Sequence, residues 1–481
     1  MKKILSTLAL LLCFTLTAQA MTPQEAVNAF AAIPALGHST AGVAVIDLDS
    51  GKIVASNNLE LACMTASTMK TVTSAVALGM LGADYRFETP VELVGSINDG
   101  VFRGDIVITG TGDPTLGSRH FPRHPDIVDE IVKALLDKGI RRVEGRVVVD
   151  NSFYPFPGYN GNWENEDLAW TYGAGVHAIN YADNEVLVRY TLNGAGAVTS
   201  YSFSPSVPGL QVINRANMHA GRSSFDVRLE YGTPAVVVMG EQRAGSNART
   251  LSNPLPDSML MASVKRAIKR GGIEMETTGR AAEKGSAHSL LLTHQSPELS
   301  AIVRSLLDRS DNMFAHALYK AVAVRAQGRT PGRGVMGANI DSQAADAIQH
   351  WLTKRGVDAG ALYQWDGSGL ARGNKASPHF FVDMLARLNN YNYGDSTNAV
   401  YLRDLMPTAN GRVGTFLAGT PLARQIVLKS GSMNAVQCFV GYYPASKPRY
   451  AFAVLVNTFD CNRPTLKNHI GHLLYNLFNE K

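Results

Sequence analysis

Cysteine is scarce in this sequence, which has only four cysteines among 481 residues. Cys13 falls in an N-terminal apolar stretch, which leaves Cys63, Cys438 and Cys461 for the rest of the chain. An odd number of widely spaced cysteines is not a disulfide framework. A single disulfide between Cys438 and Cys461 is one interpretation. A hairpin between the last two predicted strands would instead place Cys438 opposite Leu455.

Excess charge and long hydrophobic runs are also missing beyond residue 20. Residues 1–20 have the form of a secretory signal, with Lys2 and Lys3, an apolar core over 4–16 and a small-residue cleavage site at 18–20. Removing two lysines from a formal net charge of +5 leaves a chain too mildly basic to indicate nucleic acid binding. No later stretch is long enough for a membrane helix. We therefore expect an exported protein that is soluble or loosely associated with a membrane.

Motifs for nucleotides and metals are incomplete. The stretch Gly110 to Gly112 is not followed by a third glycine at Thr115, and no lysine completes a phosphate-binding loop, which favours a turn. His120 and His124 have a spacing seen among metal ligands, but Pro122 prevents the helix that would align them. We predict no cofactor and no metal site.

The most informative stretch that is present runs from Thr65 to Lys70, where Ser67 is followed three residues later by a lysine. An apolar run from Val72 to Leu81 comes next. If this run is helical, the Lys70 amine lies beside the Ser67 hydroxyl and can accept its proton, provided that burial or a neighbouring cation lowers the lysine pKa. Taken alone, the motif also fits an ordinary helix start with a solvated lysine.

The length exceeds what one hydrophobic core usually supports, so two or three domains are expected. A capping box at 22–25 predicts an N-terminal helix, and alternating residues over 42–48 and 52–57 predict a hairpin that leads to the Ser67 helix. From Phe87 to about Gly285 the chain is mostly short predicted strands, over 91–94, 105–108, 143–149, 185–192, 224–231 and 235–239, with helices only at 125–138 and 256–269.

Helices return after residue 293, and the motif Ser296 to Glu298 is expected to cap the first of them. Ser377 is expected to cap another, and three strands and a closing amphipathic helix follow. The predicted fold class is α+β, with a five-stranded antiparallel sheet flanked by helices and interrupted by a large β-rich insertion. The predicted domains are a catalytic domain over 21–86 and 287–481, an inserted domain over 87–184 and 254–286, and a small nested domain over 185–253.

Two later motifs supply groups that the Ser67 and Lys70 pair requires. Ser310, Asp311 and Asn312 offer a hydroxyl and a carboxamide at a helix junction, and Lys429 to Gly431 place a second cation and hydroxyl on an edge strand. The glycine there admits close backbone approach. Together these pieces resemble the three-part signature of penicillin-recognising serine enzymes.

The stretch between Ser67 and Ser310 is much longer than compact β-lactamases contain. An insertion at that point resembles the class C low-molecular-mass penicillin-binding proteins, the penicillin-binding protein 4 type of D-alanyl-D-alanine carboxypeptidase and endopeptidase. The resemblance extends to the stretches 86–89, 109–114, 366–372 and 429–432. Two departures are Ser430, where threonine is commoner, and Asn434, where the enterobacterial enzyme has glutamine.

The resemblance implies a role for each motif residue. Ser67 would attack the carbonyl between two D-alanines, and Lys70 would accept its proton, with Lys429 and Ser310 keeping Lys70 partly neutral and relaying the proton. Asn312 would orient Lys70 and the substrate amide. The substrate-binding residues would be Ser430 for the terminal carboxylate, Gly431 and the Ser432 N–H beside the oxyanion, and Asn434 for substrate preference.

The resemblance also implies selection of a diaminopimelate side chain, with Asp167 for its ammonium, Tyr172 for the stem peptide and Arg372 for its carboxylate. The implied partners are peptidoglycan stem peptides, their crosslinks and β-lactam antibiotics, in the periplasm, and a homodimer is left open. The alternatives are a β-lactamase or esterase on the same fold, or a catalytically silent wall-binding protein.

Overall fold

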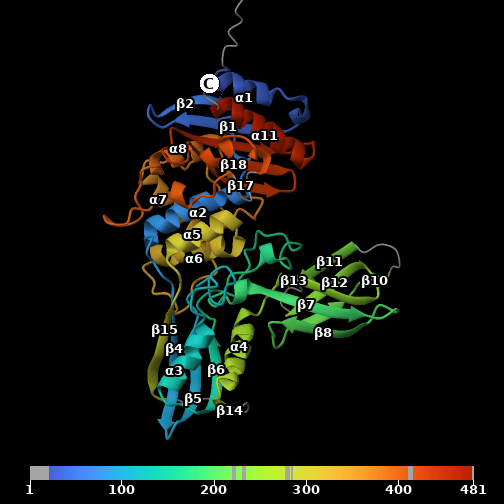
Figure 1. Cartoon of the computed structure of the whole chain (residues 1–481), viewed down its shortest axis with the longest axis vertical. Coiled ribbons are helices and arrows are strands. Elements are labelled where there is room, and N and C mark those ends of the chain that lie inside the picture. Colours follow the sequence, from blue (N-terminus) through green and yellow to red (C-terminus); the bar gives the residue numbers. More distant parts are fainter. Residues whose placement is uncertain are drawn as a thin grey trace, which may run out of the picture.

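The computed structural model describes residues 21–218, 224–229, 234–276, 282, 285–409 and 415–478. The predicted signal segment 1–20 lies outside the described residues. Figure 1 shows a body of helices around a sheet at one end of the long axis and two groups of strands towards the other end. Within the described ranges, no helix is both long and apolar enough to cross a membrane.

The sheet in the first body has five antiparallel strands, as predicted. Their order is β17 (Val427–Met433), β18 (Val436–Tyr443), β19 (Tyr450–Asn457), β1 (Thr40–Asp47) and β2 (Lys52–Asn57). Strands β1 and β2 form the predicted hairpin. The β18–β19 register places Cys438 opposite Leu455, and the three cysteines of the described chain are free thiols.

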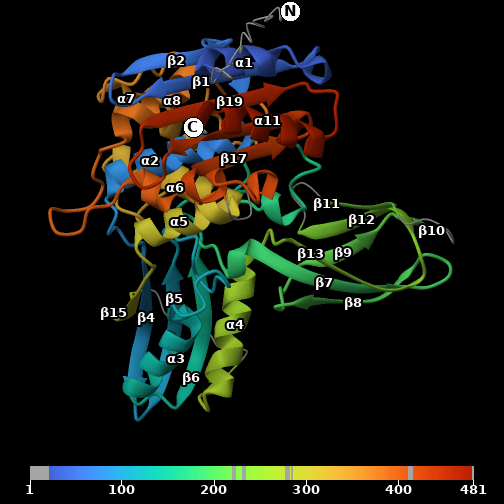
Figure 2. The ribbon, with the colours of Figure 1, turned by 45° about the horizontal axis from the view of Figure 1, so that its top comes forward.

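This sheet separates two hydrophobic cores, because successive side chains of a strand face opposite sides. Val45 of β1 faces a core shared with α1 (Pro23–Ala31) and α11 (Arg463–Phe478). Its neighbour Ile46 faces a larger core on the other side. Figure 2 shows α1 and α11 beside the sheet, with α2 (Met69–Leu81) and α6 (Asn312–Ala326) lower in the body. Helices on both faces explain why β18 is buried along its whole length.

The larger core is mainly helical. It contains α2 (Met69–Leu81), α5 (Leu299–Arg309), α6 (Asn312–Ala326), α7 (Ile340–Thr353) and α8 (Pro378–Leu388). Two short helices, α9 (Leu402–Leu405) and α10 (Leu422–Gln425), precede β17. Helix α6 packs against both α2 and α7, so the Ser67 helix lies inside this group rather than on the surface.

Three caps were expected from the sequence, and two of them form. Thr22 and Glu25 make the reciprocal capping box of α1, and the Ser377 hydroxyl accepts a backbone N–H at the start of α8. The expected cap of α5 is wrong. The Ser296 hydroxyl instead accepts the backbone N–H of Phe87 at 2.9 Å, which ties the start of the insertion to the chain that returns from it.

The insertion begins with a second five-stranded sheet. Its order is β14 (Glu274–Glu276), β6 (Arg142–Asp150), β5 (Val101–Thr109), β4 (Glu88–Asn98) and β15 (His288–Gln295). The predicted helices form as α3 (Ile127–Asp137) and α4 (Pro256–Arg270), and both pack on this sheet. Strand β15 pairs with β4, whereas the sequence analysis assigned residues from 287 onward to the catalytic domain. We therefore propose that the catalytic domain resumes after Gln295.

The segment 185–253 forms two small sheets. One contains β7 (Glu185–Leu192), β8 (Val198–Ser204) and β13 (Gly245–Ser252), and the other contains β9 (Gln211–Asn214), β10 (Asn217–Met218), β11 (Ser224–Leu229) and β12 (Ala235–Gln242). Apolar side chains from both sheets join the same cluster as the α3 and α4 side chains. The two short strands β3 (Cys63–Met64) and β16 (Lys375–Ala376) pair beside the Ser67 turn.

Candidate active site

Ser67 lies on a 3-10 turn, Ala66–Thr68, that leads directly into α2. Ala66 has a φ of 44°, a left-handed conformation that is costly for a residue with a side chain. After this turn, the amine of Lys70 lies 2.7 Å from the Ser67 hydroxyl. The predicted proximity of Ser67 and Lys70 is therefore present, but the serine lies on a 3-10 turn rather than on an α-helix.

The Lys70 amine is fully buried and has three oxygen partners. It lies 2.7 Å from the Ser67 hydroxyl, 2.6 Å from the Asn312 carboxamide oxygen and 2.7 Å from the Ser368 carbonyl. Burial lowers the pKa of Lys70 to about 7, although the carboxylates of Asp366 and Asp311 oppose the shift. A substantial fraction of the amine is therefore neutral at neutral pH and can accept a proton from the serine.

Ser310 and Asn312 flank the junction between α5 and α6. Ser310 ends α5 in a left-handed conformation, and Asp311 caps α6 by accepting the N–H of Phe314 at 3.0 Å. Asn312 is the first residue of α6, and its amide nitrogen donates to the Tyr172 carbonyl at 2.8 Å. The two helix ends thus place the Asn312 side chain beside Lys70 and the Ser310 side chain beside Lys429.

Lys429 brings the third motif to the same place. Its amine lies 2.9 Å from the Ser310 hydroxyl and 2.7 Å from the Ser430 carbonyl, on the edge strand β17. Burial and the nearby Lys70 hold the pKa of Lys429 well below its usual value. The motifs predict that this second cation keeps Lys70 partly neutral, whereas burial is the main cause of the low pKa of Lys70.

Gly431 allows β17 to lie directly against the serine turn. A β-carbon at this position would come 2.6 Å from the Thr65 carbonyl oxygen and 2.9 Å from the Ser67 backbone nitrogen. Contacts that short with rigid backbone would push the strand away. The predicted close approach at this glycine is present.

Residues 23–477 match the D-Ala-D-Ala carboxypeptidase 3 (S13) family. The chain belongs to this family. Membership confirms the prediction of a serine-type D-Ala-D-Ala carboxypeptidase. The family match extends over both cores and the insertion, so it covers the three motifs together with the strands that separate them.

Individual relatives of this family member cover most of its length. It is 25% identical over 456 residues to a D-alanyl-D-alanine carboxypeptidase of Actinomadura sp. (strain R39), which spans 90% of this chain and 80% of the relative. It is 24% identical over 463 residues to the D-alanyl-D-alanine carboxypeptidase DacB of Haemophilus influenzae, with 92% and 91% of the two chains covered.

Solved structures show the same fold. The structure of penicillin binding protein 4 from H. influenzae superposes with a TM-score of 0.73 at 23% identity, covering 91% of this chain and 96% of that one. A predatory endopeptidase of Bdellovibrio bacteriovorus, solved with an immunity protein, gives a TM-score of 0.52 at 16% identity over 92% and 93% of the chains. The predicted resemblance to the penicillin-binding protein 4 type is therefore confirmed.

The remaining residues predicted on β17 lie at the outer end of the site. Ser430 is partly buried beside Lys429, whereas Ser432 is exposed further along the strand. Asn434 lies in the exposed turn after β17. Among the described residues, Asn434 makes no hydrogen bond to a catalytic side chain, so its predicted role in substrate preference stays a prediction.

Two of the three residues predicted to select the stem peptide, Asp167 and Tyr172, are hydrogen-bonded to each other. The Tyr172 hydroxyl donates to the Asp167 carboxylate at 2.9 Å, and Tyr172 is 47% exposed. The Tyr172 carbonyl also contacts Asn312, as described above, so this segment of the insertion reaches the cluster around Lys70. Arg372 is exposed, and within the described part of the chain it forms no hydrogen bond or ion pair with either residue.

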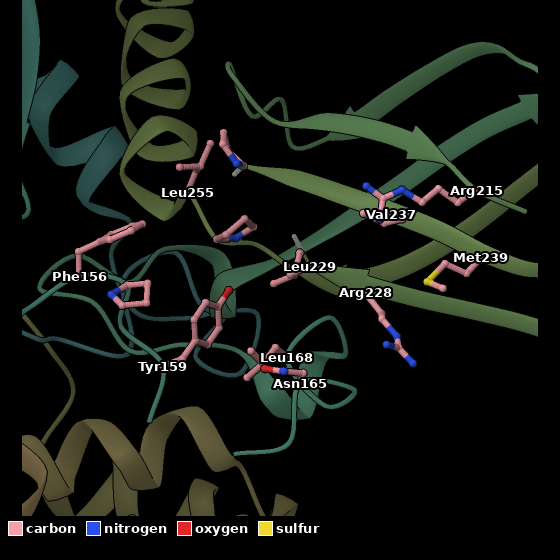
Figure 3. A pocket seen from close by; sticks show the side chains of 13 residues that line it. Phe156, Tyr159, Asn165, Leu168, Arg215, Arg228, Leu229, Val237, Met239 and Leu255 are labelled. Atoms are coloured by element: carbon pink, nitrogen blue, oxygen red, sulfur yellow. The ribbon is translucent and has the colours of Figure 1, made fainter. Parts of the chain in front are cut away.

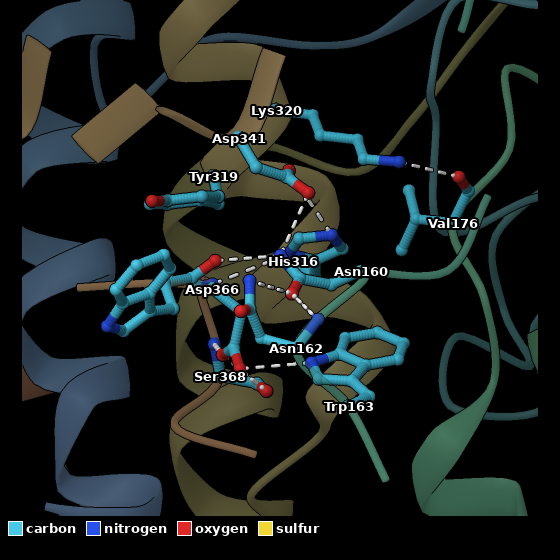
Figure 4. A network of polar contacts seen from close by, with 12 residues as sticks. Asn160, Asn162, Trp163, Val176, His316, Tyr319, Lys320, Asp341, Asp366 and Ser368 are labelled. Carbon is cyan, nitrogen blue, oxygen red and sulfur yellow. Dashed lines mark hydrogen bonds and ion pairs between the residues drawn. The ribbon is translucent and has the colours of Figure 1, made fainter. Parts of the chain in front are cut away.

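The structure adds Asp366, to which the sequence analysis assigned no role. Its fully buried carboxylate accepts backbone N–H groups of Ser368, Gly369 and Ala371, each at 2.6 Å. It also accepts the Trp163 indole N–H at 3.0 Å, which connects the insertion to this loop (Figure 4). These contacts aim the Ser368 carbonyl at Lys70.

Burial alone would raise the pKa of the Asp366 carboxyl. His316 and the N–H donors outweigh burial, so the pKa is held below its usual value and the group stays charged. An aspartate followed two residues later by Ser-Gly is a turn signal in which a carboxylate bonds nearby backbone, and this was the available sequence clue. The contact between the Lys70 amine and the Ser368 carbonyl has no such sequence clue, because the two residues are far apart in the chain.

Proposed function

We propose that this chain cleaves the bond between two D-alanines in peptidoglycan stem peptides, and the corresponding bond in crosslinks, through an acyl-enzyme on Ser67. The observation that carries the proposal is the Lys70 amine, 2.7 Å from the Ser67 hydroxyl, with its pKa lowered to about 7. A serine hydroxyl needs such a base to become a nucleophile at neutral pH. A wall-binding protein without catalysis would not need it.

Acylation begins when the Ser67 oxygen attacks the carbonyl carbon between the D-alanines. The hydroxyl proton passes to the neutral Lys70 amine, and the carbonyl oxygen becomes an oxyanion that the backbone N–H groups of Ser67 and Ser432 stabilise. The C–N bond then breaks. Lys70 then releases the proton that it took from Ser67, and the leaving amine receives it through the Ser310 hydroxyl, which lies 2.9 Å from the Lys429 amine. Lys70 is therefore neutral again before deacylation.

Deacylation repeats the sequence with water. A water molecule gives its proton to Lys70 and attacks the ester carbonyl, and the Ser67 oxygen leaves with a proton returned from the lysine. In this scheme the Ser430 hydroxyl and the nearby Lys429 hold the terminal carboxylate of the substrate. Asn312 orients both Lys70 and the substrate amide.

The stem peptide would extend towards the segment that contains Asp167 and Tyr172. The Asp167 carboxylate and the Arg372 guanidinium suit the ammonium and carboxylate at the end of a diaminopimelate side chain. The link from Tyr172 to Asn312 supports this direction, because it places the segment beside the catalytic groups. Asn434 would contact the substrate from the turn after β17.

We also propose that β-lactams acylate Ser67, because their strained amide mimics the D-alanyl-D-alanine end. A solved structure of H. influenzae penicillin binding protein 4, with a TM-score of 0.70, carries a β-lactam. The protein would act in the periplasm, where peptidoglycan and these antibiotics meet.

Intact mass after exposure to benzylpenicillin tests the proposal. We expect one covalent equivalent on the unaltered protein and none on Ser67→Ala. Equal labelling of both proteins would show that another group is the nucleophile. A label lost within seconds would instead favour the β-lactamase alternative, since a carboxypeptidase of this type keeps the ring-opened adduct.

A further inference from the structure

A cavity of about 360 Å³ lies between the loop 156–168 and the sheet that contains β9, β11 and β12 (Figure 3). This volume is at the lower end of the range for small-molecule sites. Most of its wall is apolar, from Phe156, Pro157, Leu168, Leu229, Pro234, Val237, Met239, Pro254 and Leu255. None of the proposed catalytic groups lines this cavity, so the reaction at Ser67 does not account for it.

The polar groups on the wall are mainly hydrogen-bond donors. Arg215 and Arg228 contribute guanidinium groups, and Asn165 contributes a carboxamide, whereas none of the described lining residues carries a carboxylate. Figure 3 shows the hydroxyl of Tyr159 pointing into the space. That hydroxyl is itself buried and has Ser252 as a neighbour, so the accessible polar groups of the wall are the two guanidinium groups and the carboxamide.

These groups define the chemistry of a matching ligand. Guanidinium groups bind carboxylates with two parallel hydrogen bonds, and the Asn165 carboxamide suits peptide groups. Arg228 also lies 3.5 Å from Glu166, so the test changes Arg215 and leaves that ion pair intact. The apolar wall, with Phe156 75% exposed at one side, suits small apolar side chains. An anionic peptide satisfies all of these features.

The cavity wall is continuous with the segment that reaches the active site. Asn165 and Leu168 line the cavity and flank Asp167, which accepts the Tyr172 hydroxyl at 2.9 Å. The Tyr172 carbonyl in turn accepts a hydrogen bond from Asn312. A substrate that continues past Asp167, away from the catalytic groups, therefore meets this wall next.

We propose that this cavity is a second substrate site, which binds the distal, anionic part of a crosslinked peptide while its scissile bond lies at Ser67. The inference rests on the proposed function, because it takes peptidoglycan crosslinks as the substrate. A short peptide that ends in D-alanyl-D-alanine lacks the distal part that this cavity would bind. The site would therefore favour crosslinks over single short peptides without changing the chemistry at Ser67.

The test measures binding of a purified crosslinked muropeptide dimer to the full-length Ser67→Ala protein by calorimetry. Adding Arg215→Glu reverses an exposed charge of the wall, and Met239→Trp fills the space from a partly buried position. Each change should weaken dimer binding about tenfold or more, the scale of one lost charge contact. Arg189→Glu is the matched control, because it reverses an exposed charge on β7 that does not line the cavity.

Binding of a short D-alanyl-D-alanine peptide should be unchanged in all of these variants. Unchanged dimer binding in both Arg215→Glu and Met239→Trp would overturn the second site, and so would an equal loss for the dimer and the short peptide. Penicillin acylation of proteins that retain Ser67 separates this result from the proposed function. If acylation fails in the unaltered protein, the proposed function is wrong, whereas a second site that fails leaves acylation intact.

Discussion

The Lys70 amine lies as close to the Ser368 carbonyl as to the Ser67 hydroxyl, at 2.7 Å in both cases. The carbonyl belongs to a loop whose backbone N–H groups are held by Asp366, so it cannot turn away without breaking those bonds. The position of the base is therefore set by a buried carboxylate that does not touch it. Asp366 also influences the base through its charge.

Asp366→Asn should shift the pH dependence of penicillin acylation. Only neutral Lys70 can accept the serine proton, so the rate for the unaltered protein should rise with pH up to about 7, the pKa of Lys70, and then level off. The Asp366 charge raises that pKa. Removing the charge lowers the pKa, so the rise should move to lower pH. Stopped-flow measurements of the acylation rate between pH 5 and 9 would show this shift.

The same variant should lose about 1–3 kcal/mol of unfolding free energy, because its amide cannot accept every N–H that the buried carboxylate accepts. Trp163→Phe is the control, since it removes one donor and leaves the charge in place. It should keep the pH dependence of the unaltered protein. An acylation profile for Asp366→Asn that coincides with the control would mean that Asp366 acts on the fold alone.

Lys429→Ala should slow acylation at least about a hundredfold, the low end for one electrostatic contact in a water-excluded site. Because two buried cations repel, the loss of a charged Lys429 should favour the protonated form of Lys70 and raise its pKa. The rise of rate with pH should then move to higher pH, opposite to Asp366→Asn. Near-normal acylation at neutral pH would show that Lys429 has no part in the reaction.

Gly431→Ala should reduce acylation by about tenfold to a hundredfold. The added methyl would come 2.6 Å from the Thr65 carbonyl and 2.9 Å from the Ser67 nitrogen, so β17 must move away from the serine turn. Ser432→Ala is the matched control, because it changes a side chain on the same strand and keeps the backbone N–H. Acylation rates for Gly431→Ala equal to those for the control would contradict the tight contact.

Asp167→Ala should reduce kcat/KM for diaminopimelate-containing peptides about tenfold or more, while penicillin acylation stays almost unchanged. The reason is that penicillin has no ammonium-bearing side chain for this carboxylate. Chromatographic assay of the released D-alanine would give the first rate and intact mass the second. Glu164→Ala is the control, since it removes an exposed carboxylate from the same segment. Equal losses in both reactions would assign Asp167 a structural role.

Local signals in the sequence predicted many elements of the fold. The capping box at Thr22 and Glu25, the hairpin before Ser67 and the pairing of Cys438 with Leu455 follow from residues close in the chain or from strand alternation. The pairing of β15 with β4 was missed, because the partners are far apart in sequence and a short strand carries no mark of the sheet it joins.

The sequence by itself determined the chemical groups of the site and their order, since Ser67, Lys70, Asn312 and Lys429 stand in recognisable motifs. The tertiary structure alone decided the state of the base. The low pKa of Lys70 comes from burial among distant segments, and its third contact comes from the Ser368 carbonyl. Desolvation is a property of everything that surrounds an atom, so no local run of residues can specify it.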